Sequence, residues 1–169
     1  MSLTRATIRH WLAVALITSA AMLAIAHGFE TFGHLPPCHL CLQQRAAYWV
    51  AIGVSVAGLA ISQIPLGVRL RPLICVILAL VFLTGFAIAV RHAGAEWKWW
   101  PGPEGCSGSR AASSADLARL LGGGAMAAPR CDVAPWRLLG VSMAGWNALI
   151  SLKMAVLSAV AASRARRPA

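Results

Sequence analysis

Five cysteines are the residues whose type and spacing most suggest chemistry. Cys38 and Cys41 form a C-x-x-C motif, which occurs both in redox dithiols and as half of a metal site. Cys106 and Cys131 are more widely spaced, and two disulfide pairs follow naturally: Cys38 with Cys41, and Cys106 with Cys131. Such disulfides persist in an oxidising compartment such as the bacterial periplasm. Cys75 lies within an apolar run, where a free cysteine behaves as a small hydrophobic residue.

The surroundings of the C-x-x-C motif favour redox chemistry. Pro36 and Pro37 end any earlier helix and an apolar run follows soon after, which places Cys41 at or near a helix N-terminus. The free N–H groups and the dipole of a helix N-terminus favour a thiolate. Arg45 lies one turn further on and adds a positive charge, which favours Cys41 as the leaving group in thiol exchange. The alternative for Arg45 is an interfacial arginine that pairs with lipid phosphate.

A metal site is the alternative use of the same motif. It needs four thiolate or imidazole ligands, which Cys38, Cys41, His34 and His39 could supply. The sequence lacks a second closely spaced pair of ligands. A metal-binding or scaffold membrane protein therefore stays open as an alternative. A thiol titration separates the two, because an isolated oxidase should contain two reducible disulfides and a metal binder should contain free thiols.

The elements that must position these cysteines are membrane helices. Hydrophobic residues make up 59% of the 169 residues, charged residues make up 12%, and the mean hydropathy is +0.69. These values exclude a disordered chain. They also argue against a soluble domain, which would lack the polar residues to cover its surface. Four apolar runs are long enough to cross roughly 30 Å of hydrocarbon as helices, at residues 11–29, 46–66, 72–90 and 138–162. The first also resembles a signal peptide, but its apolar core is longer than usual. We predict an all-α integral membrane protein, a four-transmembrane-helix bundle forming a single domain over residues 1–169.

The net charge of +10 is distributed very unevenly along the chain. The segments before the first run, between the second and third runs, and after the fourth carry arginines and no acidic residue. All five acidic residues lie in the loops 30–41 and 91–137. This positive-inside pattern predicts cytoplasmic termini and two periplasmic loops, the longer carrying a short amphipathic helix near residues 113–121. The sequence has no basic stripe interleaved with aromatic residues, so we expect no nucleic-acid binding.

Together these features resemble the DsbB family, bacterial inner-membrane disulfide oxidases that re-oxidise the periplasmic thiol oxidase DsbA with quinone. The matching residues are Cys38-His39-Leu40-Cys41-Leu42-Gln43-Gln44-Arg45 at the second run, His92 after the third, Cys106, Cys131-Asp132, Trp136-Arg137-Leu138-Leu139-Gly140-Val141 and Trp146-Asn147. A four-helix relative of the vitamin K epoxide reductase type is a further alternative. Such proteins usually place the active C-x-x-C late in the bundle, whereas here it comes early.

The resemblance implies a route for electrons through the cysteines. Cys106 would receive the attack of a reduced DsbA-like partner, and Cys131 would be freed. Cys131 would then attack Cys38, and Cys41 would leave as a thiolate that faces the quinone.

The resemblance also implies a cofactor, ubiquinone or menaquinone, drawn from the membrane quinone pool. Arg45 and His92 would contact the quinone oxygens. Gln44 is a third candidate residue for the quinone site. Some family members carry Glu at this position, and an amide cannot supply a carboxylate there.

Overall fold

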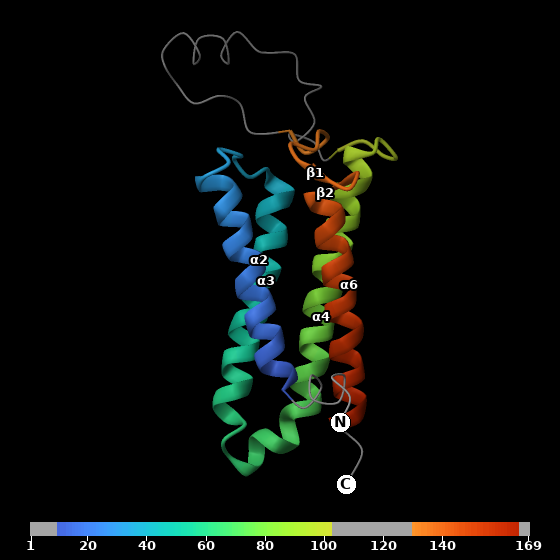
Figure 1. Ribbon diagram of the computed structural model, residues 1–169. Helices are drawn as coiled ribbons and strands as arrows, with labels where there is room; N and C mark the ends of the chain where they lie inside the picture. Colours follow the sequence, from blue (N-terminus) through green and yellow to red (C-terminus); the bar gives the residue numbers. More distant parts are fainter. Residues whose placement is uncertain (1–9, 103–129, 166–169) are drawn as a thin grey trace.

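Within the part of the chain that the structure describes, four long helices stand side by side in our computed structural model (Figure 1). The structure describes residues 10–102 and 130–165. The helices are α2 (Trp11–Thr31), α3 (His39–Ile61), α4 (Pro65–Glu96) and α6 (Met143–Ala165). Each contains a segment long and apolar enough to cross a membrane, which in α4 is Arg69–Glu96. The predicted four-helix, all-α membrane architecture is therefore confirmed.

The helices do not end where the apolar runs end. At the end of the bundle next to Cys38 and Cys41, called the cysteine end below, α3 begins at His39, whereas the second uncharged run begins at 46. At the same end α4 continues to Glu96, whereas the third uncharged run ends at 90. The hydrogen bonds of a helix join backbone groups, so a helix can continue through polar residues after an apolar run has ended. The extra turns carry Gln44, Arg45 and His92, three of the residues predicted to serve the quinone.

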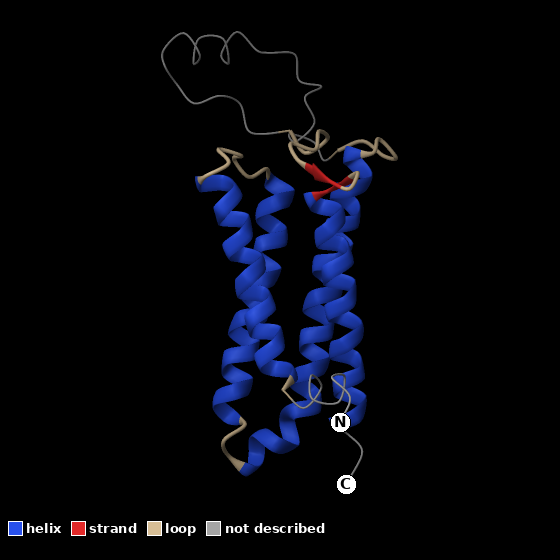
Figure 2. Cartoon of the chain, in the orientation of Figure 1, coloured by secondary structure: helices blue, strands red, loops and turns tan. Residues whose placement is uncertain are grey.

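A short hairpin precedes α6. The sequence had suggested that the fourth span begins within the residues that form this hairpin. Strand β1 (Arg137–Leu138) pairs antiparallel with β2 (Val141–Ser142), and Arg137 lies opposite Ser142. The two turn residues, Leu139 and Gly140, have φ of 53° and 79°. Two consecutive left-handed residues form the turn that suits a two-residue hairpin, and they interrupt an otherwise apolar segment. Figure 2 shows this hairpin at the same end of the bundle as the loop between α2 and α3.

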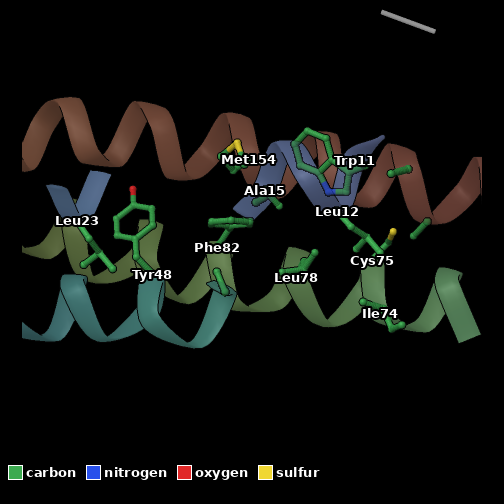
Figure 3. Packing of buried hydrophobic residues seen from close by; sticks show 14 residues of the cluster. Trp11, Leu12, Ala15, Leu23, Tyr48, Ile74, Cys75, Leu78, Phe82 and Met154 are labelled. Carbon is green, nitrogen blue, oxygen red and sulfur yellow. The ribbon is translucent and has the colours of Figure 1, made fainter. Parts of the chain in front are cut away.

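The bundle core runs along the middle of the helices. Helix α4 packs against both α3 and α6, and α2 packs against α3. Phe82 and Leu78 on α4 are fully buried, and the Tyr48 and Phe82 rings lie 6.3 Å apart at their centroids. Cys75 is buried in the same cluster, as predicted for a small hydrophobic residue (Figure 3).

The two ends of the bundle differ in their chemistry. The indole Nε1 of Trp11 donates a hydrogen bond of 3.0 Å to Ser158 Oγ, which joins the start of α2 to the last turns of α6. The opposite end holds the start of α3, which Cys38 caps, together with the hairpin and the end of α4 (Figure 1). Cys106 and the helix predicted near 113–121 lie outside the described residues.

Candidate functional site

The C-x-x-C motif forms the first turn of α3. Cys38 is the N-cap residue, and its Sγ accepts a hydrogen bond of 3.3 Å from the backbone N–H of Cys41. The two sulfur atoms lie 2.8 Å apart. Cys38 is buried and Cys41 is half-buried. Contact with Cys41, followed by burial, raises the pKa of the Cys38 thiol to about 12.

Cys131 packs directly against this pair. It is fully buried in a cluster with Cys38 and Leu40, and Cys41 packs against the same cluster. Thiol exchange needs one sulfur to reach another, and this packing brings Cys131 to the motif. Three of the four predicted redox cysteines therefore meet at one place, while Cys106 lies outside the described residues.

An ionic anchor holds the segment around Cys131. The Asp132 carboxylate accepts hydrogen bonds from Lys98 Nζ at 2.8 Å and from Arg130 Nη2 at 2.9 Å. Lys98 Nζ also donates to the Asp132 carbonyl at 2.7 Å. Arg130, and then Lys98, hold the pKa of Asp132 well below its usual range. Because Lys98 lies two residues after the end of α4, this anchor fixes the Cys131 segment to the end of that helix.

Gln44 and His92 lie side by side next to the cysteine pair. Gln44 is buried, and its Nε2 donates to the Leu40 carbonyl at 3.2 Å and contacts His92 Nδ1 at 2.8 Å. The other ring nitrogen of His92, Nε2, lies 3.6 Å from Cys38 Sγ. The structure therefore links Gln44 to Cys38 through the His92 ring.

Two further polar side chains extend this network into the bundle. Asn147 Nδ2 donates to Gln44 Oε1, and the Tyr48 hydroxyl donates to Asn147 Oδ1. The Tyr48 oxygen also lies 3.2 Å from Ser151 Oγ. Sequence reasoning assigned no role to Tyr48 or Ser151, because each lies alone in an apolar run with no motif around it.

A buried carboxylate, which the sequence analysis missed, completes the surroundings of His92. The Glu96 side chain is only 2% exposed, and its Oε1 lies 3.7 Å from His92 Nε2. The Ser142 hydroxyl donates to Glu96 Oε2. The sequence did contain a signal for the first contact, since residues four apart share a helix face.

Arg45 reaches the site as one half of an ion pair. Its Nη1 donates to Glu30 Oε2 at 2.5 Å, and its Nη2 donates to the Ala26 carbonyl at 3.1 Å. The Arg45 side chain is 13% exposed and that of Glu30 is 38% exposed. Arg45 therefore ties α3 to α2, and nothing in the sequence pattern indicated Glu30 as its partner.

A cavity of about 700 Å³ opens beside these groups. Polar side chains at its wall include Cys41, Arg45, His92 and Glu96. Much of the remaining wall is apolar, and there the rings of Phe29 and Trp136 lie 5.1 Å apart. A mostly apolar cavity with a few convergent polar groups is typical of a site for a small organic molecule. It suits a quinone, which is a flat ring with two acceptor oxygens and an apolar tail.

The side chains of Cys38, Cys41 and His92 also bear on the metal-binding alternative. The sulfur atoms of Cys38 and Cys41 and a ring nitrogen of His92 lie within 4.8 Å of one another. A structural zinc site uses four ligands. His34 and His39, which the sequence offered as further ligands, are both exposed. The group formed by the described residues thus contains three donors, one fewer than such a site requires.

Comparison with known proteins identifies the family. The family model for disulfide bond formation protein DsbB matches residues 8–161. The chain belongs to the DsbB family. It is therefore a multi-pass membrane protein of disulfide bond formation, and DsbB proteins are generally quinone-linked.

One curated relative supports this membership. Disulfide bond formation protein B of Dechloromonas aromatica (strain RCB) is 29% identical to the chain over 154 residues, which cover 89% of each protein. No solved structure matches the chain.

Proposed function

We propose that the chain is a membrane thiol:quinone oxidoreductase that re-oxidises a periplasmic DsbA-like thiol oxidase and passes two electrons to ubiquinone or menaquinone. The observation that carries this proposal is the position of the C-x-x-C pair. Cys38 is packed against Cys131 on one side, and both Cys38 and Cys41 line the cavity on the other. The pair can therefore take electrons from the loop cysteines and deliver them to a molecule in the cavity.

A series of thiol exchanges brings the electrons to this pair. The thiolate of the reduced partner attacks Cys106, forms a mixed disulfide and releases Cys131 as a thiolate. Cys131 attacks Cys38, and Cys41 leaves with the electron pair of the broken S–S bond. The partner's second thiol then attacks the mixed disulfide and frees Cys106, and Cys106 attacks Cys131 and releases Cys38 as a thiolate. The outer disulfide has then formed again, and Cys38 and Cys41 together hold the two electrons that came from the partner.

The cavity supplies the remaining contacts. A quinone, when bound, supplies a two-electron, two-proton acceptor. Arg45 and His92 offer N–H donors to its oxygens, and Phe29 and Trp136 offer aromatic surface to its ring. Gln44 lines the same cavity and holds His92 in place through Nδ1.

The charge distribution supports an orientation in the inner membrane. The cysteine end of the bundle would face the periplasm, since the described arginines of the basic segments, Arg69, Arg71 and Arg164, lie toward the other end. Arg69 and Arg71, at the start of the α4 span, represent that basic end. Both termini would then be cytoplasmic.

The proposal is tested with the full chain in lipid nanodiscs. A reduced thioredoxin-fold oxidase of the DsbA type is added with ubiquinone or menaquinone, and formation of the partner's disulfide is followed. We expect multiple turnovers only with quinone, loss of turnover in Cys38→Ser and Cys41→Ser, and normal turnover in Cys75→Ala. Turnover that continues without quinone, or in Cys41→Ser, would reject the proposal.

A further inference from the structure

A tight turn follows α4 directly. Lys98 has a left-handed φ of 61°. Its backbone N–H donates to the Ala95 carbonyl at 3.1 Å, and the backbone N–H of Trp99 donates to the Gly94 carbonyl at 2.9 Å. This pair of bonds is a Schellman motif, which ends a helix and redirects the chain. Residues 97–100 form this turn and are called the tryptophan turn below.

Trp100 packs back onto the last turns of α4. Its Nε1 donates to the Arg91 carbonyl at 2.8 Å, and a Cβ atom added at Gly94 would overlap its ring. Arg91 and Gly94 are three residues apart and so share one face of α4. His92 and Glu96, which line the cavity, share another. Figure 1 shows the chain after α4 leaving the bundle on the side away from α2.

The tryptophan turn presents an aromatic surface beside a positive charge. All three of its indole rings are exposed, Trp99 most of all at 64%. The centroids of the Trp97 and Trp99 rings lie 4.7 Å apart, and those of Trp99 and Trp100 lie 6.0 Å apart, so the rings form one continuous surface. Arg91 is also exposed, and no described residue forms an ion pair with its side chain.

The position of this surface along α4 matches the headgroup layer of a membrane. As a helix, the uncharged run 72–90 covers about 28 Å, close to the roughly 30 Å of hydrocarbon. Gly94 lies about 6 Å beyond the end of that run, and the headgroup layer is roughly 5–8 Å thick on each side. Because Trp100 packs onto Gly94, its indole lies at the level of that layer. Tryptophan is enriched at this depth, and a guanidinium pairs well with phosphate.

We propose that Arg91 and the tryptophan turn bind phospholipid headgroups at the cysteine end of the bundle. The Arg91 guanidinium offers a planar fork of donors to a lipid phosphate, and each indole offers an apolar ring with a polar edge. The same turn supplies Lys98 to the anchor around Asp132. The lipid-bound surface is therefore continuous with the segment that carries Cys131.

The first test locates the three indoles in a bilayer, without quinone or partner. The full chain is placed in nanodiscs whose phosphatidylglycerol carries bromine either near the headgroup or near the end of the acyl chain. The signal of the turn is the fluorescence lost in the triple variant Trp97→Phe/Trp99→Phe/Trp100→Phe. We expect bromine near the headgroup to quench this signal most and acrylamide in the water to quench it weakly.

A control indole shows that the brominated lipid reaches the protein. Trp49 is exposed within the second uncharged run, so the signal lost in Trp49→Phe should be quenched by the lipid in any case. A turn signal that lipid does not quench would overturn the proposal, whether acrylamide reaches the indoles or a second copy of the chain shields them from both quenchers.

The second test measures the contribution of Arg91. In dodecyl maltoside micelles, we titrate phosphatidylglycerol brominated near the headgroup. We expect Arg91→Gln to raise the lipid fraction that half-quenches the turn about fivefold, which corresponds to about 1 kcal/mol for one arginine at an anionic surface. Arg137→Gln removes an exposed arginine from the hairpin at the same end and should leave that fraction unchanged. Equal shifts in both variants, or none in Arg91→Gln, would overturn the proposal.

Gly94→Ala tests the packing of Trp100 without endangering the helix. The added Cβ displaces the Trp100 ring from α4, while alanine favours the helix more than glycine does. We expect lipid to quench the turn less in this variant and acrylamide to quench it more. Unchanged quenching by both would contradict the position of Trp100 in the headgroup layer and overturn the proposal.

Discussion

Replacing Arg45 tests whether its charge serves the quinone or only joins two helices. Arg45→Ala removes a charge-assisted donor at the cavity wall, together with the ion pair to Glu30. A hydrogen bond to a charged group contributes about 1.5–3 kcal/mol. If Arg45 donates such a hydrogen bond to a quinone oxygen, losing that bond raises the quinone KM about tenfold to a hundredfold. The KM for the reduced partner should stay close to that of the unmodified protein.

The structure provides a matched variant on the other side of the ion pair. Glu30→Gln keeps the Arg45 cation and still offers it an amide oxygen. We expect no rise in the quinone KM for Glu30→Gln. A purely structural tie between α2 and α3 predicts that Glu30→Gln and Arg45→Ala raise the KM together.

Arg45→Lys refines the same comparison. The Arg45 guanidinium uses separate nitrogens for Glu30 and for the Ala26 carbonyl, and a single ammonium lacks that planar fork. Lysine should therefore recover only part of the loss. Steady-state kinetics at saturating partner and varied quinone measure all three variants. An unchanged quinone KM in Arg45→Ala would refute the reasoning and return Arg45 to the role of an interfacial arginine.

Three further predictions concern the exchange route, the core and the orientation. Cys131→Ser should accumulate a mixed disulfide with the partner on non-reducing gels, because no thiol resolves it, and Cys106→Ser should not; equal trapping would mean that the attacked sulfur is misassigned. Phe82→Ala should cost about 3–5 kcal/mol in denaturant unfolding, and Leu83→Ala, on the exposed side of α4, should cost less; equal losses would contradict the packing. Single cysteines placed at positions 68 and 166 should resist an impermeant maleimide on intact cells, while one at 110 reacts; the reverse pattern would invert the topology.

The sequence predicted the bundle well because hydrocarbon imposes a simple requirement. A lipid-exposed segment must be long, apolar and helical, so uncharged runs show where the spans lie. The start of α3 was also predictable, since Pro36 and Pro37 stop an earlier helix. The hairpin before α6 was not, because Leu138 and Val141 are as apolar as the helix that follows.

The polar contacts of the site were less accessible from sequence. The Arg45–Glu30 pair joins two different helices, and local spacing does not encode such pairs. Glu96 lies one turn beyond His92, and its burial depends on Ser142, which arrives from the hairpin. These partners meet only after the helices pack, so tertiary structure decides their roles.

In the proposed function, the Cys38–Cys41 pair hands two electrons to a quinone. The most direct test uses the fully reduced chain in nanodiscs, without oxygen or partner, and one equivalent of quinone in a single turnover. We predict one quinol per chain together with a Cys38–Cys41 disulfide identified by mass spectrometry, and no quinol from Cys41→Ser. Quinol formation that is equal in Cys41→Ser, or a disulfide that forms without quinol, would contradict the account.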